Sequence, residues 1–434
     1  MMSKRTTAAM TLALALGGLS GPQAASSQIT AASPAVLATA NNYTALARGF
    51  TAIALNPAGL AMPGNPGFSL TLFPVQAQAG LSGMKLSEIA TYDGQSIPAS
   101  VRQEWLTSVT EDGGFELRSD VSFTGLALSI GPVGLQISTV GAARANLSPD
   151  AFELLMFGNA GLTGTTREMS LDGTEASSWA ATTGALAVGI PLPSVKDGNF
   201  AMGVTLKYTV GHFTALASDF GSVVRGDSIG LSLPSIINIP EDFSPNPLDE
   251  VNNNGTGVGL DLGLAWEGEK WGFSAAVQNV FHTFEWDLTA AEYRVGEITA
   301  VIDEITTNFA EGPPTGATLA LEGELLGQRF KPAINLGVAY RASEKLAVTA
   351  DYRHETGETL VFGSRTRAGL GVEWNLLSFL PLRTGMSAVS GGGVQLGAGF
   401  GLELGPVQLS FAYLSEKNSN GEFKAASFAL SFGG

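Results

Sequence analysis

The clearest feature of the chain is a regular alternation of apolar and polar residues between Val394 and Leu414. The apolar positions of its first half share one parity: Val394, Leu396, Ala398, Phe400, Leu402 and Leu404. The residues between them are small or polar, and Gly405-Pro406 separates this half from a second alternating run. Successive side chains of a strand point to opposite faces. The pattern therefore predicts a β-hairpin with one apolar face of membrane length, which is typical of a transmembrane β-barrel wall.

Similar alternating segments recur along the chain, and many have about ten residues, enough to cross the hydrocarbon core when tilted. Short links between them, such as Gly405-Pro406, alternate with long links, such as residues 214–255. Outer-membrane barrels show this alternation of short periplasmic turns with longer external loops. It predicts strands at 67–80, 115–130, 133–145, 178–190, 199–213, 256–267, 271–281, 331–341, 345–355, 364–374, 382–390, 393–404, 407–415 and 423–432. Their number is even, as a bacterial barrel requires, so we interpret residues 284–295, which also alternate, as an extension above the membrane within one long loop.

The composition favours a membrane barrel over a soluble β-sandwich or propeller. Charged residues make up 14% of the chain and glycine 55 of 434 residues, while the mean hydropathy is +0.19. Soluble domains carry about 25% charged residues, and the exposed faces of their sheets are polar. After the N-terminus there is no run of about 18 apolar residues, so helical spans are not expected. Because lipid cannot satisfy an open sheet edge, we expect a closed barrel.

The N-terminus has the pattern of a secretory signal. Lys4 and Arg5 precede an apolar stretch from Ala8 to Leu19, which is too short to span a bilayer. The expected division is a signal peptide at 1–25, an N-terminal hatch or plug at 26–66 and an outer-membrane barrel at 67–434. The chain has no cysteine, so it forms no disulfide and carries no lipoprotein anchor. A formal net charge of −16 argues against nucleic-acid binding, and we expect the bacterial outer membrane as the location.

Residues 26–66 do not alternate, and they contain the motif Asn56-Pro57-Ala58-Gly59-Leu60-Ala61 after an alanine-rich stretch. In this motif the chain resembles the FadL family of outer-membrane transporters for hydrophobic molecules. The resemblance implies a hatch that plugs a barrel of the size counted above. The plug or gate residues it implies are Asn56, Pro57, Ala58, Gly59 and Leu60. Similar motifs occur in PorV-like barrels that serve a secretion system, which Thr256–Leu264 and Gln278-Asn279-Val280 also resemble. Asn56-Pro57 fits equally a structural turn, because proline ends a helix.

The polar parity of the C-terminal half carries arginines that we expect in the lumen: Arg341, Arg353, Arg365, Arg367 and Arg383. A charge on the lipid face would cost about 2–4 kcal/mol at the bilayer midplane. One interpretation is a cationic stripe that binds a carboxylate ligand through Arg353, Arg365 and Arg367. The other is a network of ion pairs that supports the plug. The second is favoured by charged residues that share the inward faces: Asp351, Glu373, Glu403, Lys207, Asp261 and Glu267.

The long links contain helical patterns. Ser148-Pro149-Asp150 is a helix start, with serine as N-cap and proline in the first position. Residues 101–109 and Glu297–Phe309 also place apolar residues at helical spacing. These loops are expected outside the cell, where their apolar residues would form a capture groove for a ligand. The expected ligand contacts are Leu154, Leu155, Met156 and Phe157. The alternative is that the helices pack on each other and cap the barrel.

The sequence offers no constellation for catalysis. His212, His282 and His354 are predicted at strand ends, without metal-ligand spacing, and an interfacial position is expected for them. There is no G-x-S-x-G or H-E-x-x-H motif, and Asp249-Glu250 lacks the spacing of an EF-hand. We therefore expect no enzymatic activity, no metal and no cofactor.

Together these patterns predict an all-β fold, a transmembrane antiparallel β-barrel of about 14 strands. We expect the N-terminal plug inside the barrel and short helices in the external loops. The leading hypothesis is a channel for passive uptake of hydrophobic small molecules such as long-chain fatty acids, with outer-membrane lipid and the ligand as its partners. The alternative is a non-transport barrel that acts as a secretion-system accessory or scaffold and binds a protein partner.

Overall fold

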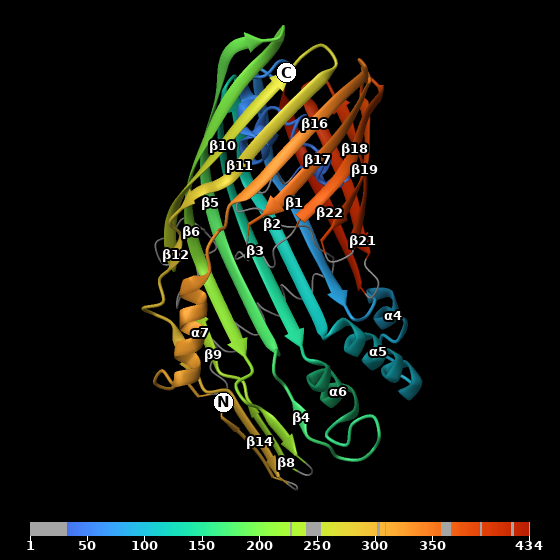
Figure 1. Cartoon of the computed structure of the whole chain (residues 1–434), viewed down its shortest axis with the longest axis vertical. Helices are drawn as coiled ribbons and strands as arrows, with labels where there is room; N and C mark the ends of the chain where they lie inside the picture. The colour runs from blue at the N-terminus through green and yellow to red at the C-terminus, as the bar shows by residue number, and fades with distance from the viewer. Residues whose placement is uncertain are drawn as a thin grey trace.

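The computed structural model describes residues 33–225, 228–239, 253–301, 304–308, 310–356, 366–390, 393–417 and 421–433. These residues form an antiparallel β-barrel that carries helices and a small sheet at one end (Figure 1). Short turns join the strands at the opposite end, where the C-terminus also lies. The predicted signal peptide, Arg365 and Asp249-Glu250 lie outside the described residues.

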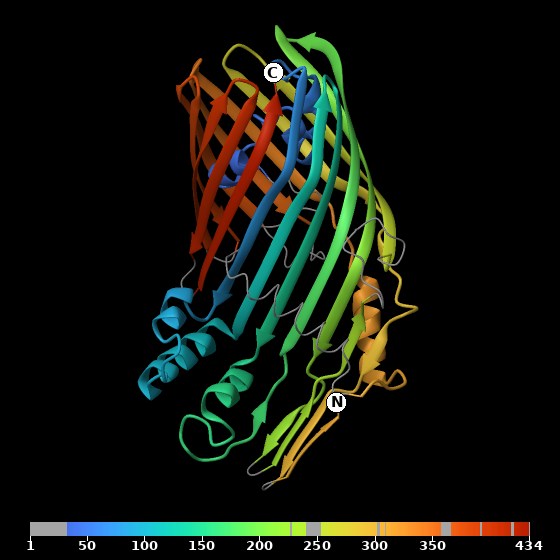
Figure 2. The same cartoon turned by 180° about the vertical axis from the view of Figure 1, so that it is seen from behind.

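The barrel wall has fourteen strands in the described part of the chain. The main sheet contains 17 strands, and setting aside the short β9, β12 and β13 leaves fourteen. β1 pairs with both β2 and β22, which closes the barrel (Figure 2). The wall strands are β1 (Phe68–Ser82), β2 (Phe115–Ile130), β3 (Val133–Leu147), β5 (Glu175–Val195), β6 (Gly198–Ser218), β10 (Gly255–Glu267), β11 (Trp271–His282), β16 (Ala333–Ser343), β17 (Leu346–Glu355), β18 (Thr366–Leu377), β19 (Leu380–Val389), β20 (Gly393–Leu404), β21 (Val407–Lys417) and β22 (Gly421–Gly433). Each predicted segment overlaps one of them, so the predicted all-β barrel is confirmed.

The two faces of the wall differ as the alternation predicts. In β6, Leu206 and Tyr208 are 57% and 53% exposed on the outer face, while Lys207 between them is 4% exposed. In β20, Leu396 is 57% exposed and Gln395 is 1% exposed. The apolar outer face suits a hydrocarbon environment, and the polar side chains of the wall point into the lumen.

Aromatic side chains gather on the outer face near the short turns. The ring centroids of Trp271 and Tyr340 lie 4.7 Å apart, and those of Trp266 and Phe273 lie 5.7 Å apart. Trp271 and Phe273 are each 48% exposed. Aromatic rings are enriched where a barrel wall crosses the membrane–water interface. Their position therefore fits an interface at the short-turn end.

Two of the irregularities in the wall strands involve a non-glycine residue with a positive φ. In β1, Phe73-Pro74 is unpaired, Phe73 has φ +55°, and the register with β22 shifts. Proline has no N–H for the ladder, so an irregularity of this kind allows it to lie within a strand. In β11, Asn279 has φ +53°, and pairing with β16 ends at Gln278. The second irregularity leads the chain away from β16 and toward the lumen.

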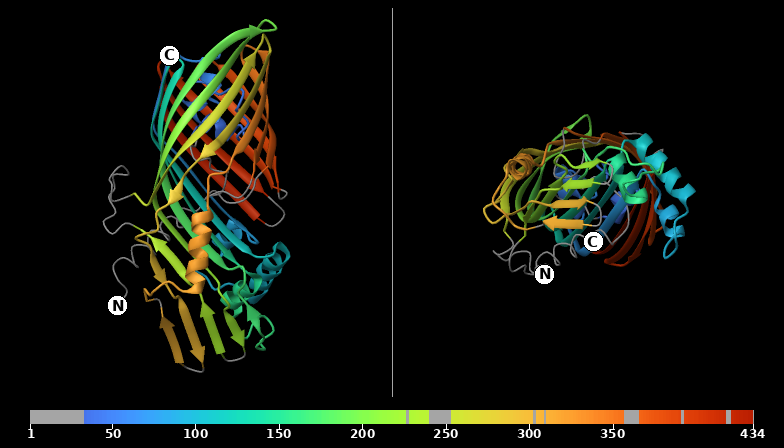
Figure 3. Two further views of the ribbon diagram at one scale, coloured as in Figure 1. Left: turned by 60° about the vertical axis from the view of Figure 1, so that its left-hand side comes forward. Right: turned by 90° about the horizontal axis from the view of Figure 1, so that it is seen from below.

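The end opposite the short turns carries helices and a second sheet (Figure 3). The helices are α4 (Leu86–Thr91), α5 (Ala99–Asp112), α6 (Pro149–Phe157) and α7 (Gly316–Gly327). The second sheet contains β4 (Met169–Ser170), β7 (Val223–Arg225), β8 (Ser228–Ser232), β14 (Glu297–Val301) and β15 (Glu304–Asn308). The helices predicted at 101–109 and after Ser148 are confirmed, and the Ser148 hydroxyl accepts a hydrogen bond from the N–H of Ala151 at 3.2 Å.

The helix predicted at Glu297–Phe309 is wrong, because β14 and β15 pair as an antiparallel hairpin there. The segment is rich in isoleucine, threonine and valine, whose branched side chains lose freedom in a helix and suit a pleated strand. β14 also pairs with β8, which helical spacing within one segment does not reveal. Residues 284–295 belong to the link between β11 and β16, as predicted: β12 (Glu285–Trp286) pairs with β10, and β13 (Glu292–Arg294) pairs with β9 (Ser235–Asn238). Their position above the membrane stays a prediction.

Residues 33–66 lie inside the barrel near the short turns (Figure 1). They form α2 (Pro34–Ala38), α3 (Phe50–Leu55) and the 3-10 helix η1 (Pro57–Ala61). Helices this short are marginal on their own, so contacts with the wall hold them. α2 packs on β19 to β22, and η1 packs on β5, β6 and β10.

Candidate functional site

The lumen contains three successive layers, and β6 passes all of them. We define them as the N-terminal segment (residues 33–66), the polar layer (Lys207, Asp261, Gln278, Asn279 and Arg353) and the aromatic cluster (Trp179, Phe284, Trp286 and Phe330). Along β6, Gly203 faces η1, Lys207 belongs to the polar layer, and Gly211 faces the aromatic cluster. The distance from Gly203 to Gly211 is about 27 Å along the strand. The layers therefore follow one another from the short turns toward the end that carries α4 to α7 and the second sheet.

Inward glycines allow the N-terminal segment to lie directly against the wall. A Cβ at Gly203 would lie 2.2 Å from the backbone nitrogen of Ala58, and a Cβ at Gly263 would lie 2.1 Å from Oδ1 of Asn56. Gly397 lies similarly close to α2, since a Cβ at this position would lie 2.5 Å from the Ala38 carbonyl oxygen. At all three positions a Cβ would be closer to its neighbour than van der Waals contact allows. Gly203 and Gly397 are thus explained by the backbone that they face, and Gly263 by the Asn56 side chain.

Asn56 fixes the motif that carried the family resemblance. It is 1% exposed; its Oδ1 accepts a hydrogen bond from the N–H of Ala58 at 3.1 Å, and its Nδ2 donates to the Leu264 carbonyl on β10 at 3.0 Å. Pro57 begins η1 directly after α3, so the proline acts as a turn between two helices. Ala58, Gly59 and Leu60 are buried in η1. A gating role for residues 56–60 stays a prediction.

Three carboxylates of the wall hold the N-terminal segment. The Tyr43 hydroxyl donates to Oε2 of Glu373 at 2.9 Å, and Arg48 forms an ion pair of 2.5 Å with Glu267. Backbone contacts add to these: the N–H of Thr44 donates to Asp351 at 2.8 Å. Charge-assisted hydrogen bonds are among the stronger polar contacts in proteins. The stretch from Tyr43 to Arg48 is therefore attached to the wall at both ends.

The arginines predicted in the lumen lie beside acids or beside the N-terminal segment. Arg353 is 8% exposed and donates to Glu355 at 3.0 Å and to Gln278 and Asn335 at 2.8 Å. Arg367 donates to the Asn41 carbonyl at 3.4 Å. The other two form ion pairs: Arg341 with Glu267 at 3.0 Å and Arg383 with Glu373 at 2.6 Å. This geometry fits the network that supports the N-terminal segment, and ligand binding by Arg353 and Arg367 stays a prediction.

The polar layer is built around a buried ion pair. Lys207 and Asp261 approach to 2.5 Å, and their side chains are 2% and 4% exposed. Lys207 also donates to Oδ1 of Asn279, whose backbone N–H donates to Asp261 at 2.7 Å. The Asn279 Nδ2 reaches the Lys331 carbonyl at 3.3 Å. Because a buried ion pair needs further hydrogen bonds to offset its lost hydration, Asn279 completes the pair and at the same time joins β11 to the chain that leads to β16.

The aromatic cluster lies on the inner face of β3, β5, β6 and β10. Its four side chains are at most 4% exposed. The centroid of the Phe284 ring lies 4.9 Å from the centroid of the Trp286 ring and 5.4 Å from that of the Phe330 ring. A Cβ at Gly211 would lie 2.4 Å from the Trp286 ring. The sequence interpretation missed this cluster. The available signal was the pair of aromatic residues in the alternating stretch 284–295, together with the glycines of β6 and β10.

The predicted ligand contacts on α6 have different environments. Met156 and Phe157 pack against a buried group on α5 that includes Trp105, and the Arg102 guanidinium lies 4.9 Å above the Phe157 ring. Leu154 packs against the second sheet, in a buried group that includes Met169 and Val224. Leu155 is 67% exposed. Of the four, Leu155 is thus the side chain most available for a first contact with a ligand, and ligand binding by all four stays a prediction.

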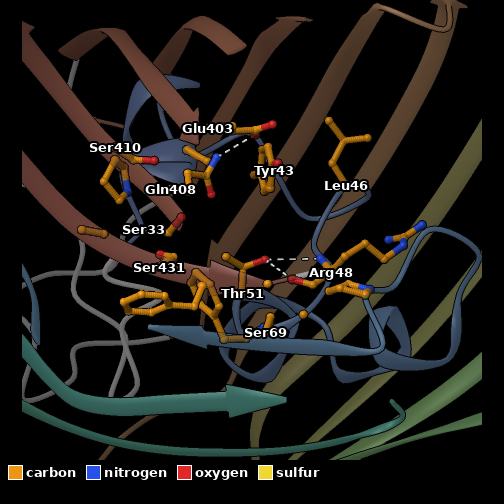
Figure 4. Close-up of a pocket in the computed structure, with 18 of the residues that line it drawn as sticks. Ser33, Tyr43, Leu46, Arg48, Thr51, Ser69, Glu403, Gln408, Ser410 and Ser431 are labelled. Carbon is orange, nitrogen blue, oxygen red and sulfur yellow. Dashed lines mark hydrogen bonds between the residues drawn. The ribbon is translucent and has the colours of Figure 1, made fainter. Parts of the chain in front are cut away.

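Two cavities lie at the short-turn end, on either side of the stretch from Tyr43 to Arg48. Figure 4 shows the first of them. The first has a volume of ≈ 320 Å³ and is lined by residues of the N-terminal segment and of β19 to β22, including Glu403. The second has a volume of ≈ 200 Å³ and lies toward β16 to β18. Both Tyr43 and Arg48 line both cavities, so this stretch separates them.

The histidines do not gather in the structure. His282 ends β11 and His354 lies one residue before the end of β17, but His212 lies well within β6, so its predicted position at a strand end is wrong. β6 continues for six residues beyond His212, to Ser218. Nε2 of His212 lies 2.7 Å from the Thr182 hydroxyl oxygen. Among the described residues no group of three or more His, Cys, Asp or Glu side chains could hold a metal ion. None of the described helices has the length and apolar character needed to cross a membrane.

Comparison with known proteins identifies a family. A family model described as "Family of unknown function (DUF5723)" matches residues 60–413. The chain belongs to this family. The match extends from the end of η1 to β21 and so includes the polar layer and the aromatic cluster. No curated protein matches the sequence.

Several solved structures are similar over most of their length. The P. putida toluene transporter TodX is 12% identical, with 89% of this chain and 94% of that chain covered and a TM-score of 0.45. A Pseudomonas aeruginosa FadL homologue is 11% identical, with 95% and 99% covered and a TM-score of 0.47. The Ralstonia pickettii toluene transporter TbuX is 14% identical, with 92% and 97% covered and a TM-score of 0.46.

Proposed function

We propose that the chain is a bacterial outer-membrane channel through which hydrophobic small molecules diffuse. The observation that carries the proposal is the aromatic cluster inside the lumen, between the external helices and the polar layer. Buried rings suit the passage of apolar molecules, whereas water-filled pores have polar linings. The apolar outer face of the wall supports the location in the outer membrane. The motif at Asn56–Ala61, which resembles that of FadL-type transporters, supports the same class of function.

The proposed route has three steps. A hydrophobic molecule first contacts the external helices, where Leu155 is exposed. It then enters the lumen at the aromatic cluster. Its exit at the short-turn end is closed by the N-terminal segment, which acts as the plug, with Asn56 and Pro57 against β6 and β10. Movement is diffusive and follows the concentration gradient of the ligand, and long-chain fatty acids belong to the class of molecules that would pass.

An uptake assay in whole cells tests this proposal. The chain is expressed in a Gram-negative host that lacks its own hydrophobic channels, because the lipopolysaccharide leaflet is the barrier that such a channel bypasses. Uptake of radiolabelled oleate and of radiolabelled toluene is compared with uptake by cells that carry an empty vector. We expect faster uptake of at least one of the two molecules. Equal rates in both strains, with the folded barrel present at the cell surface, would overturn the proposal.

The scaffold alternative makes a different prediction for the same cells. Crosslinking and purification would then recover a protein partner in fixed stoichiometry, and uptake of both labelled molecules would equal that of the empty-vector cells. The two experiments together therefore distinguish transport from a role in secretion.

A further inference from the structure

We propose that the aromatic cluster is a binding site for an apolar molecule that carries an oxygen acceptor, and that the indole N–H of Trp286 binds this oxygen. The inference rests on the proposed function and adds to it a chemical class of ligand and a residue that recognises it. Ketones, esters and carboxylic acids with an aryl or alkyl body belong to this class. Plain hydrocarbons do not.

The first argument is the indole of Trp286 itself. Trp286 is 3% exposed, and its Nε1 has no hydrogen-bond partner among the described residues. By contrast, Nε1 of Trp266 on the outer face donates to the Val195 carbonyl at 2.7 Å. Buried indole N–H groups usually find a partner, and a buried donor without one costs about 1–3 kcal/mol. An oxygen atom placed beside Nε1 of Trp286 would satisfy this donor.

The second argument is the way in which the rings are held. Phe284 and Trp286 meet edge to face, with an angle of 84° between their planes, and Phe330 meets Phe284 at 62°. Such ring pairs contribute about 0.5–1.5 kcal/mol each. A contact between two rings of the cluster can therefore be exchanged for a contact with an aryl group of the ligand at a small cost in free energy. The rings of Phe284 and Trp286 are carried by or next to β12, which has only two residues. The segment is also held to β10 on both sides, since the N–H groups of Thr283 and Asp287 donate to the carbonyls of Val258 and Asn254 at 2.9 Å.

The third argument is the shape of the wall behind the rings. A Cβ at Gly257 would lie 2.2 Å from Cα of Phe284, and a Cβ at Gly211 would lie 2.4 Å from the Trp286 ring. The rings therefore lie on bare backbone, with Val140 and Ala181 as the neighbouring apolar contacts. If the rings shift, they uncover a smooth apolar surface that fits a planar or extended hydrocarbon body.

A second unpartnered polar group borders the cluster. Ser122 on β2 is 0% exposed, its hydroxyl has no partner among the described residues, and it pairs in register with Val140 of the same buried group. Thr124, two residues further along the same face, also lacks a partner for its hydroxyl in the described part of the chain. A hydroxyl both donates and accepts. Ser122 and Thr124 therefore place hydroxyls without a described partner on the inner face of the strand that pairs with β3.

A matched pair of probes tests the inference. 4-Fluoroacetophenone and 1-ethyl-4-fluorobenzene share a similar carbon skeleton, and only the first carries an oxygen acceptor. Binding of each to the full chain in lipid nanodiscs is measured by ligand-observed ¹⁹F NMR. Partition into the lipid is the same for every variant, so the change in Kd between variants reports the protein site. The test variant is Trp286→Phe, which keeps a ring and removes the N–H; the control is Trp266→Phe, whose indole lies on the outer face.

We expect Trp286→Phe to raise the Kd of 4-fluoroacetophenone roughly three- to tenfold, the usual effect of one hydrogen bond. The Kd of 1-ethyl-4-fluorobenzene should change by less than about twofold, since it makes no such bond. Trp266→Phe should change the Kd of neither probe. Equal changes for both probes, or none, would overturn the inference.

The uptake assay separates this failure from a failure of the proposed function. If radiolabelled toluene or oleate enters expressing cells faster than control cells while Trp286→Phe affects both fluorinated probes equally, only the ligand assignment fails. If neither labelled molecule enters faster, the channel function itself fails.

Discussion

The hydroxyl of Tyr43 donates a hydrogen bond of 2.9 Å to Glu373, a residue 330 positions away in the sequence. The same carboxylate oxygen accepts a hydrogen bond of 2.6 Å from Nε of Arg383. One acid thus joins the N-terminal segment to β18 and β19. Because Tyr43 lies between the cavities of ≈ 320 and ≈ 200 Å³ at the short-turn end, this bond holds the stretch that separates them.

The first prediction concerns this bond. Tyr43→Phe removes the donor and keeps the ring, and a hydrogen bond to a charged group contributes about 1.5–3 kcal/mol. The stretch from Tyr43 to Arg48 should then leave its place more often, and openings of single channels in planar bilayers should become roughly tenfold more frequent. Tyr208→Phe is the control, since Tyr208 is 53% exposed on the outer face. Identical opening frequencies in the Tyr43 variant and the wild type would contradict the prediction.

The second prediction concerns the glycine that faces η1. Gly203→Ala would place a Cβ 2.2 Å from the backbone nitrogen of Ala58, so η1 has to move or the wall has to distort. Overpacking of this kind typically costs about 1–3 kcal/mol. We expect faster proteolysis of residues 33–66 and a lower unfolding temperature in heat-modifiability gels. Gly184→Ala is the matched control, because no atom lies within 4 Å of the Cβ at that position; similar behaviour of the two variants would refute this explanation of the inward glycines.

The third prediction concerns acid pH at α6. Burial acts to raise the pKa of Asp150, but hydrogen bonds from Arg167 and from the N–H of Ser170 outweigh it and hold the pKa below its usual range. Arg167 contacts Asp150 at 2.6 Å and Glu153 at 2.5 Å. A carboxyl whose pKa is lowered in the folded state stabilises that state above its unfolded pKa, about 3.9, and the contribution is lost as the pH falls through the lower folded value. The protection of the α6 amides from hydrogen exchange, relative to the intrinsic exchange rate at each pH, should therefore fall only below about pH 4.

Two arginine variants test the same contact at neutral pH. Arg167→Ala leaves two carboxylates, one of them buried at Glu153, without their cation and should speed exchange in α6 several-fold. Arg225→Ala removes an exposed pair with Glu168, in which both side chains are about two-thirds exposed, and exposed pairs contribute roughly 0–1 kcal/mol. An equal effect of the two substitutions would show that Arg167 does not hold the loop.

The wall could be predicted from sequence because lipid imposes its pattern on each strand separately. Leu206 and Tyr208 must face outward whatever the other strands do, and the parity of Lys207 follows. The hairpin of β14 and β15 could not be predicted in this way, since its pairing with β8 is a contact between distant segments. Helical and strand patterns are also hard to separate in short apolar runs.

In the candidate site, too, local features could be predicted from the sequence and contacts between distant segments could not. Asn56-Pro57 was visible as a local motif, and the inward position of Arg353 followed from strand parity. The partners of these residues were not visible, because the register of the barrel brings Leu264 to Asn56 and Gln278 to Arg353. The aromatic cluster was missed for a similar reason: its rings come from β5, from β12 and the residue before it, and from the chain before β16, and they meet only when the barrel is closed.

The last prediction concerns the first contact of a ligand with the external helices. Leu155 is 67% exposed at the end of the barrel that faces away from the short turns, so Leu155→Ser removes an apolar contact without leaving a cavity. Losing about half of the contact of one leucine side chain corresponds to about 1 kcal/mol, and uptake of radiolabelled oleate at low concentration should fall roughly fivefold while the unfolding temperature stays unchanged. Leu319→Ser on α7, with Leu319 53% exposed, is the control for a general loss of apolar surface. If both variants take up oleate at the wild-type rate, capture does not begin on α6; if both lose uptake equally, the external end as a whole, rather than Leu155, attracts the ligand.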